Sequence, residues 1–220
     1  MTETRPAVDV LTEPFTLPNG FVVPNRIAKA ALSEGLARRD GSPGSRIKRL
    51  YRRWADSGAG LVVTGNVMID PRAVGEPGNV VVQDDRHAAD LAEWATVAKA
   101  GGSAVLVQLN HPGRQVPRTL SARPVAPSAI ALPGGAGVFA EPRELTSEEI
   151  EAIVRGFAAA AGAVTRAGFD GVQIHGAHGY LVSQFLSPLS NVRTDDWGGT
   201  PEKRRRFLLE VVRAVRAEIG

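Results

Sequence analysis

Two histidines and a tyrosine stand directly after a short apolar run. His175, His178 and Tyr180 follow residues 171–174. Neutral imidazole N–H groups at the end of a strand can hold a carbonyl oxygen and stabilise negative charge that develops on it. A phenol is a weak acid at neutral pH, but it suits the protonation of a carbanion formed in the same step. This spacing indicates a polar active site at the end of a strand.

The same histidines allow a second interpretation, a metal-dependent hydrolase. His175 and His178 together with His111 would supply three nitrogen ligands to a metal ion. On a segment that runs from a strand into a loop, however, the His-x-x-His pair need not converge as it would on a helix. Asp195 and Asp196 lie far along the chain. The residues therefore favour oxyanion binding, and we expect no metal site.

Further polar residues stand at the ends of other apolar runs. Gln108 carries an amide that can both donate and accept, which suits the imide-like edge of a flavin or a pyrimidine. Ser33 could offer a hydroxyl to a cofactor, although serine at such a place is also a common turn former. Asn191, Arg193 and Asp195 are expected to hydrogen-bond one another and to hold the loop that follows the histidines.

Apolar runs alternate with helical patterns along the chain. The expected strands are residues 26–31, 60–64, 103–109 and 169–174. Apolar residues at helical spacing fall between and after them, at residues 47–54, 91–98, 150–161 and 207–215. Regular alternation of this kind predicts a parallel sheet with right-handed crossovers. Before it, two short apolar runs flank Pro18-Asn19-Gly20, the signal of a β-hairpin.

The fold class that follows is α/β, of the (β/α)₈ TIM-barrel type. A closed barrel of this kind takes roughly 250 residues. The 220 residues of this chain supply about the first four βα units, preceded by the N-terminal β-hairpin. We therefore predict one domain over residues 1–220, the N-terminal half of a barrel, with residues 1–13 as a flexible extension. The long Pro- and Gly-rich excursion at 111–145 is expected to be a binding loop.

Composition excludes several classes of protein. The chain has no cysteine, so a disulfide, an iron–sulfur cluster and a thiolate zinc site are all excluded. Its formal net charge is only +3, and the basic cluster at 203–206 is expected to be a solvated helix face, not a nucleic-acid patch. No signal-peptide pattern and no apolar run of about 20 residues is present. We expect a cytoplasmic protein with a small-molecule substrate and neither nucleic acid nor membrane as a partner.

Three segments of the sequence resemble the old yellow enzyme family of NADH:flavin oxidoreductases. They are NRIAKAALSEG at 25–35, VQLNHPGRQ at 107–115 and HGAHGYLVSQFLSPLSNVRTDDWGG at 175–199. The resemblance runs from about Pro14 to the end of the chain. It implies a TIM barrel that holds FMN at the C-terminal ends of its strands. It also implies that NAD(P)H reduces the flavin, which passes hydride to an activated alkene such as an α,β-unsaturated carbonyl.

The resemblance also implies a role for individual residues. His175 and His178 would bind the substrate carbonyl or nitro oxygen, and Tyr180 would protonate the α-carbon. Gln108 would pair with the pyrimidine edge of the flavin. The remaining expected flavin contacts are Ala30, Ala31, Leu32, Ser33 and Asn66. The serine stands where the family has Thr or Cys, and the asparagine where it has a small residue.

The chain departs from the family in its extent. The family barrel continues through four more strands, with an arginine beside the flavin and loops that grip its phosphate. TIM barrels commonly build such phosphate sites after strands seven and eight. We therefore expect weak FMN binding unless a homo-oligomer or a second, C-terminal half-barrel chain completes the barrel. The alternatives are a catalytically silent fragment or an interaction module and, from the histidines, the metal hydrolase.

Overall fold

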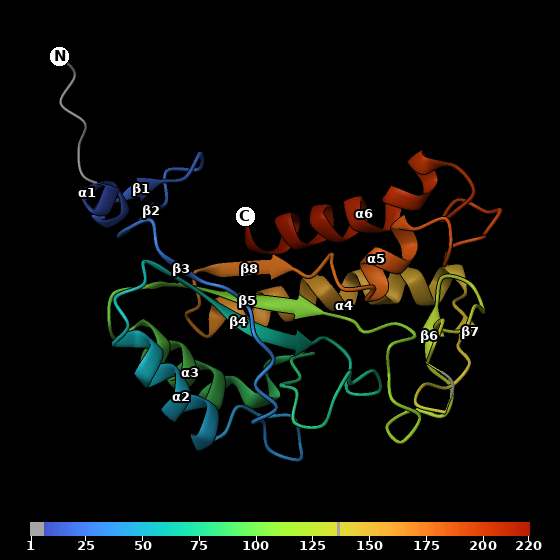
Figure 1. The fold of residues 1–220 in the computed structure, drawn as a ribbon, viewed down its shortest axis with the longest axis horizontal. Helices are drawn as coiled ribbons and strands as arrows, with labels where there is room; N and C mark the ends of the chain where they lie inside the picture. Colours follow the sequence, from blue (N-terminus) through green and yellow to red (C-terminus); the bar gives the residue numbers. More distant parts are fainter. Residues whose placement is uncertain (1–6, 136) are drawn as a thin grey trace.

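A parallel sheet of four strands forms the centre of the molecule. The computed structural model describes residues 7–135 and 137–220. The strands lie side by side in the order β3 (Ala28–Lys29), β4 (Leu61–Met68), β5 (Ala104–Asn110) and β8 (Gly171–Ile174). The arrowheads of β4, β5 and β8 point the same way in Figure 1, so the carboxyl ends of the strands meet at one edge.

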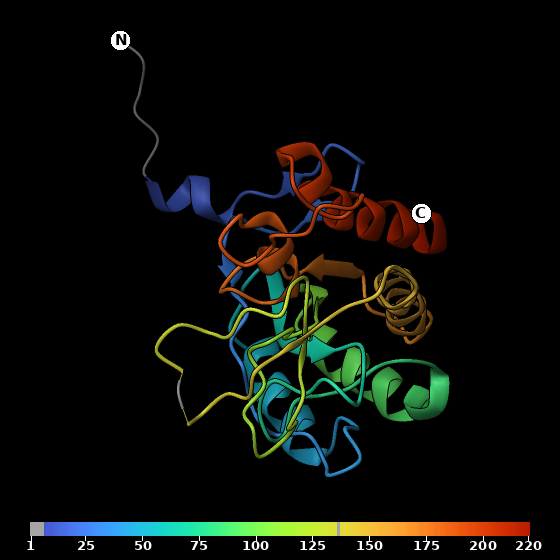
Figure 2. The same ribbon diagram turned by 90° about the vertical axis from the view of Figure 1, so that its right-hand side faces the viewer.

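Four long helices follow the strands in turn and cover one side of the sheet, as Figure 2 shows. They are α2 (Ser45–Ala55), α3 (Ala88–Lys99), α4 (Ser147–Arg166) and α6 (Pro201–Ile219). Between helices and sheet lies a core built from alternate residues of the strands, such as Val62, Val105 and Val107, and from large side chains of the helices. The predicted alternation of strand and helix is confirmed.

Local sequence signals place the helix starts. The Thr146 hydroxyl accepts from the Glu149 N–H while the Glu149 carboxylate accepts from the Thr146 N–H, which completes the predicted capping box of α4. At the start of α6 the Thr200 hydroxyl accepts from the Lys203 N–H, and Pro201 occupies the first turn. Both ends therefore satisfy backbone N–H groups that a helix start leaves without partners.

Shorter elements complete the fold. The predicted hairpin is present, and β1 (Phe15–Thr16) pairs antiparallel with β2 (Val22–Val23). Four short pieces were not predicted from the sequence: η1 (Asp85–His87), β6 (Val125–Ala126), β7 (Arg143–Glu144) and α5 (Leu181–Leu186). The two strands among them pair with each other inside the long excursion.

Two expected elements differ in the structure. The strand expected at 26–31 is only two residues long, because the chain beyond Lys29 leaves the sheet and passes over Gly65 in the middle of β4. The extension expected to be flexible at 1–13 lies partly outside the described residues. Its described part contains helix α1 (Ala7–Thr12), where the Leu11 carbonyl accepts from the Arg26 N–H at 2.9 Å.

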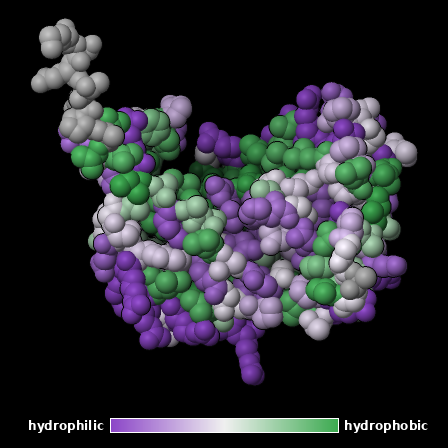
Figure 3. Space-filling view, in the orientation of Figure 1, coloured by the Kyte–Doolittle hydropathy of each residue, from purple (hydrophilic) through white to green (hydrophobic). Residues whose placement is uncertain are grey.

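The side of the sheet away from the helices is open. A cavity of about 790 Å³ lies between the hairpin, the inner face of the sheet and the end of α6. Its lining is mainly apolar and includes Phe15, Phe21, Leu106, Val212 and Ile219. Figure 3 shows hydrophobic residues around this hollow. Across the described part of the chain, no helix is long and apolar enough to cross a membrane.

Two glycines give a matched test of this packing. A Cβ at Gly101 would lie 1.9 Å from the carbonyl oxygen of Ala55, so α3 and α2 can meet only if residue 101 has no side chain. A Cβ at Gly156, inside α4, would meet only Ile69 at 3.5 Å. We expect Gly101→Ala to lower the free energy of unfolding by about 1–3 kcal/mol. Gly156→Ala should raise it by about 0.5–1 kcal/mol. Urea denaturation measures both, and equal effects would contradict this packing.

Candidate active site

A row of three polar side chains crosses the inner face of the sheet near its carboxyl edge. Asn66 of β4 is in register with Gln108 of β5, which is in register with Gln173 of β8. Residues in register on parallel strands point to the same face, and here that face is the inner one. The row forms a polar floor above the apolar layer that contains Leu106.

The floor is held together by side-chain amides. The Gln108 Nε2 donates to Gln173 Oε1 at 2.7 Å, and Asn79 Nδ2 donates to Asn66 Oδ1 at 3.4 Å. Only 8% of Gln108 and 9% of Asn66 is exposed. Among the described residues, nothing donates to Gln108 Oε1, so this oxygen is available as an acceptor. Gln173 was missed in the sequence analysis, although an inward position beside Gln108 was a usable signal.

A bulge in β4 aims Asn66 at this floor. From Val63 to Asn66 the strand has one residue more than its partner β5 has between Leu106 and Gln108. The Thr64 hydroxyl fills the gap in the ladder by accepting the Gln108 N–H at 3.0 Å. Bulges are frequent beside active sites because they re-aim a side chain.

The segment expected to lie along the flavin crosses the bulge. A Cβ at Gly65 would lie 2.3 Å from the Leu32 carbonyl oxygen, so residues 30–33 pass directly over this glycine. Leu32 is 63% exposed. Within the described ranges, no backbone hydrogen bond is made by the N–H of Ala31, Leu32 or Ser33. An apolar side chain and free N–H groups therefore border the polar floor.

A half-buried carboxylate anchors that segment. Glu34 Oε1 accepts from the Tyr51 hydroxyl at 2.6 Å and from the Gly65 N–H at 3.0 Å. The second bond satisfies the N–H that the bulge leaves without a ladder partner. Burial, together with the charge of Glu34, raises the pKa of Tyr51 well above its usual value, so its hydroxyl remains a donor. The sequence analysis missed this role of Glu34.

His175 is a neutral donor. It is 5% exposed, and burial, reinforced by His178, lowers its pKa from 6.5 to about 4. Its Nδ1 accepts the Ala177 N–H at 3.2 Å. In the neutral ring the proton must then sit on Nε2, which becomes the donor. The structure thus gives His175 the tautomer that an oxyanion-binding role requires.

His178 and Tyr180 lie beside His175. The His175 ring centroid is 5.1 Å from that of His178 and 5.0 Å from that of Tyr180, both edge to face. Burial, helped by the charge of Glu76, raises the pKa of Tyr180, so the phenol keeps its proton. His178 has a φ of 57°, a left-handed conformation that is uncommon for a residue with a side chain. The structure brings the three predicted catalytic residues together.

The long excursion holds this turn in place. With its amide oriented to satisfy both partners, Gln115 donates to the carbonyls of His178 and Gly179 at 2.9 and 2.6 Å. Gln184, on α5, is 1% exposed and donates to the carbonyls of Pro112 and Gly179 at 3.1 and 2.7 Å. Bonds of this kind offset the cost of the left-handed turn.

The loop after α5 is held as the sequence predicts. The Arg193 guanidinium donates to the Asp195 carboxylate from Nε at 3.0 Å and from Nη2 at 2.6 Å. The backbone N–H of Arg193 donates to Asn191 Oδ1 at 3.3 Å. The same guanidinium donates from Nη1 to the carbonyls of Pro127 and Leu145 at 2.9 and 2.6 Å. Arg193 therefore ties the loop to the excursion.

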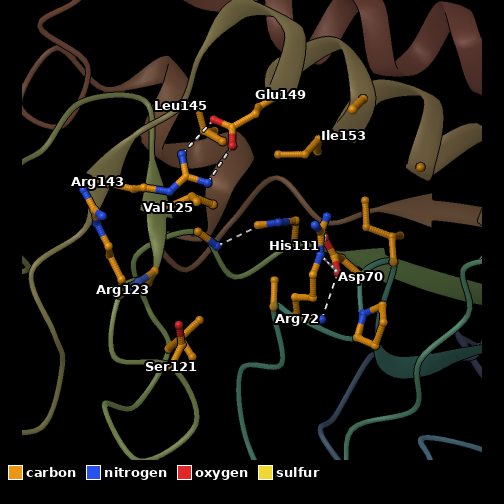
Figure 4. A pocket seen from close by; sticks show the side chains of 18 of the residues that line it. Asp70, Arg72, His111, Ser121, Arg123, Val125, Arg143, Leu145, Glu149 and Ile153 are labelled. Carbon is orange, nitrogen blue, oxygen red and sulfur yellow. Dashed lines mark hydrogen bonds and ion pairs between the residues drawn. The ribbon is translucent and has the colours of Figure 1, made fainter.

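A separate cavity of about 730 Å³ lies between the excursion, the loop after β4 and the first half of α4. Figure 4 shows its charged residues, which are largely paired: Arg143 with Glu149 at 2.6 Å and Arg72 with Asp70 at 2.8 Å. Its lining includes none of the predicted site residues. His111 lines this cavity, whereas His175 and His178 do not. Within 7–135 and 137–220, no group of three His, Asp or Glu residues could hold a metal ion.

A family model for the NADH:flavin oxidoreductase / NADH oxidase family matches residues 10–220. The chain belongs to this family. An NADH-dependent flavin oxidoreductase (iliE) of Hypocrea jecorina is 42% identical over 224 residues, which cover 94% of this chain and 56% of that relative. An NADH:fumarate oxidoreductase of Klebsiella pneumoniae is 41% identical over 204 residues, 92% of this chain and 22% of that protein.

Solved structures of the old yellow enzyme type have the same fold. A homologue from Zymomonas mobilis superposes with a TM-score of 0.88 at 34% identity, covering 96% of this chain and 60% of that one. Morphinone reductase gives a TM-score of 0.87 at 33% identity, with 96% and 59% covered. The chain spans about half the length of some curated relatives and less than a third of others. The predicted membership of a flavin-dependent oxidoreductase family is confirmed.

The buried neutral histidines should make the free energy of unfolding depend on pH. Burial lowers the pKa of His111 from 6.5 to about 4, against the opposing charge of Asp70. As the pH falls below 6.5, the unfolded chain therefore binds a proton before the folded chain does. The free energy of unfolding should fall between pH 6.5 and about pH 4, by about 3 kcal/mol from this residue, and His175 acts in the same direction.

Urea denaturation between pH 7 and pH 4 measures this effect. We expect His111→Gln to flatten the dependence and His87→Gln, on the half-exposed η1, to leave it unchanged. Stability that is independent of pH in this window would contradict the buried, neutral state of His111.

Proposed function

We propose that this chain is the N-terminal half of an FMN-dependent ene-reductase that uses NAD(P)H to reduce activated C=C bonds such as α,β-unsaturated carbonyls. The observation that carries the proposal is the His175–His178–Tyr180 cluster beside the polar floor at the carboxyl edge of the sheet. Names among the relatives, such as NADH-dependent flavin oxidoreductase and NADPH dehydrogenase, support the reductant class.

The residues present fit a flavin. Free backbone N–H groups at residues 31–33 suit the polar edge of an isoalloxazine, and the exposed Leu32 suits its flat apolar surface. Gln108, with an unused amide oxygen, would face the pyrimidine ring, with Asn66 and Ala30 beside it. When bound, FMN would supply hydride transfer between the nicotinamide and the alkene.

The histidines bind and polarise the substrate. Nε2–H of His175, fixed by the Ala177 N–H on the other nitrogen, would donate to the carbonyl or nitro oxygen, and His178 would donate to the same atom. Each such donor contributes roughly 3 kcal/mol to lowering the barrier where negative charge develops on that oxygen. Neutral rings suit this role because they donate without transferring their proton.

Tyr180 supplies the proton. Its phenol stays protonated because burial and Glu76 raise its pKa, and it lies 5.0 Å from the His175 ring, measured between centroids. It would donate to the α-carbon of a substrate whose oxygen is held by the two histidines. Hydride addition at the β-carbon and protonation at the α-carbon together give the saturated product.

Four further βα units would complete the barrel. The apolar hollow of about 790 Å³ beside β8 supports this, because an open inner sheet face is the surface that later strands of a barrel cover. The alternative is a catalytically silent fragment or an interaction module that uses this hollow for pairing.

Retention of FMN tests the proposal. We expect the purified chain to keep a flavin absorption band after incubation with FMN and desalting, weakly because the phosphate loops of later strands are absent. Leu32→Asp, which places a charge on the surface proposed for the ring, should abolish the band. Leu189→Asp, an 83% exposed surface residue, is the matched control and should retain it. Loss of the band from the folded chain alone would favour the fragment hypothesis.

Replacing the proton donor tests the mechanism. With Tyr180→Phe we expect reoxidation of the reduced flavin by 2-cyclohexenone to slow by about 100-fold or more, as for loss of a general acid. Reduction by NADH should be unchanged, because no proton from the phenol is needed in that step. Stopped-flow absorbance separates the two half-reactions. Equal slowing of both would indicate a structural role for Tyr180.

A further inference from the structure

The cavity of about 730 Å³ in Figure 4 lies apart from the proposed active site and has the size of a small-molecule site. Side chains from the loop after β4, the excursion and the first half of α4 meet around it. Val125, Leu145 and Ile153 give it apolar walls. A ligand that fits these walls has an apolar body.

His111 presents an N–H to this cavity. The residue is 3% exposed, and burial lowers its pKa to about 4, so the ring is neutral. Its Nδ1 accepts the Gly113 N–H at 3.1 Å, which leaves the ring proton on Nε2. Among the described residues, Nε2 has no hydrogen-bond partner. A buried donor without a partner costs free energy that a bound acceptor recovers.

The Nε2 atom reaches the open space of the cavity. Three side-chain atoms of the described residues are fully enclosed and without a partner, and Nε2 of His111 is not one of them. Because His111 lines the cavity, this N–H is accessible to an acceptor placed there.

Arg123 supplies a second free donor to the same lining. It lies shortly before β6 and is exposed, and within 7–135 and 137–220 its guanidinium has no hydrogen-bond or ion-pair partner. In the view of Figure 4, Val125 lies between Arg123 and His111. A free guanidinium can hold a carboxylate through two parallel N–H···O bonds. The two donors therefore stand at different ends of the apolar walls.

The carboxylates of the lining are already engaged by the protein. Asp70 and Glu149 each accept from an arginine, at 2.8 and 2.6 Å. Bonds from its own backbone N–H and from the Thr146 hydroxyl hold the pKa of the Glu148 carboxyl below its usual value. The groups that remain open in the lining are therefore donors, which favours a ligand rich in acceptors over a cation.

We propose that this cavity is a binding site for a small acid that carries a carboxylate at one end, an apolar body and a carbonyl oxygen at the other end. Arg123 binds the carboxylate, and the His111 Nε2–H donates to the carbonyl oxygen. The body packs against the apolar walls between them. The site needs neither flavin nor turnover, so it stands or falls independently of the proposed function.

Binding of 4-acetylbenzoate to the purified chain, followed by ligand-observed NMR, is the first test. This acid has a carboxylate, an aromatic ring and a ketone oxygen in that order, and we expect saturable binding with a Kd of about 1 mM or tighter. 4-Acetylbenzamide lacks the charge and 4-ethylbenzoate lacks the ketone oxygen, so each should bind about tenfold more weakly. Equal affinity for all three, or no saturable binding of the acid, would overturn the proposal.

Substitutions assign the two ends. Arg123→Gln should weaken both acids by on the order of tenfold and leave the amide unchanged. Arg118→Gln, at another exposed arginine of the excursion but outside the lining, is the matched control. His111→Asn keeps an acceptor for the Gly113 N–H but removes the Nε2–H, so it should abolish the preference for the ketone over the ethyl compound. If His111→Asn does not fold, the two acids compared on the unchanged chain still decide whether the ketone oxygen is recognised.

Filling the cavity locates the bound acid. Ala152 is exposed on α4 and lines the cavity, so Ala152→Phe should abolish binding. Ala159→Phe, exposed on the same helix outside the lining, should retain it. Binding that survives in folded Ala152→Phe would place the acid elsewhere, the proposed active site included, and would overturn the proposal. If that variant does not fold, an unchanged affinity in Arg123→Gln has the same meaning.

Discussion

The site depends on one half-buried carboxylate and the two donors that it satisfies. Glu34 receives the Tyr51 hydroxyl from α2 and the Gly65 N–H from the bulge of β4. A bulge leaves a backbone N–H without a ladder partner, and a buried N–H without any partner costs roughly 1–3 kcal/mol. Glu34 accepts from this N–H and so stabilises the bulge. The segment at 30–33, which precedes Glu34 in the chain, is thereby held over Gly65. Glu34 thus fixes helix α2, strand β4 and the segment at 30–33 relative to one another.

A second set of long-range bonds holds the turn that carries His175, His178 and Tyr180. Gln115, from the excursion, donates to the carbonyls of His178 and Gly179, and Gln184, from α5, also donates to the Gly179 carbonyl. The Leu181 N–H donates to the His111 carbonyl at 3.0 Å. Side chains on a turn that is already held in place lose little further conformational entropy when a ligand binds, which is what preorganisation of a site means.

The sequence predicted what local pattern controls. Apolar alternation located the strands and helices, the capping residues located two helix starts, and HGAHGY placed two histidines and a tyrosine together at a strand end. What it could not predict depends on partners far along the chain. The bulge needs Glu34, and the amide pair of Gln108 needs Gln173, which lies 65 residues away. Such contacts leave no periodic signal.

The bulge in β4 determines which side chains of the strand point to the inner face of the sheet. Before it, Val63 points inward and Val62 outward; after it, Asn66 points inward and Val67 outward. If the same residues ran as a regular strand with no bulge, the alternation would continue unbroken, and Asn66 would point into the helix-packed core while Val67 faced the site. The bulge therefore decides whether the floor beneath the proposed flavin is polar or apolar. In this molecule, counting along a strand matters as much as which residues it contains.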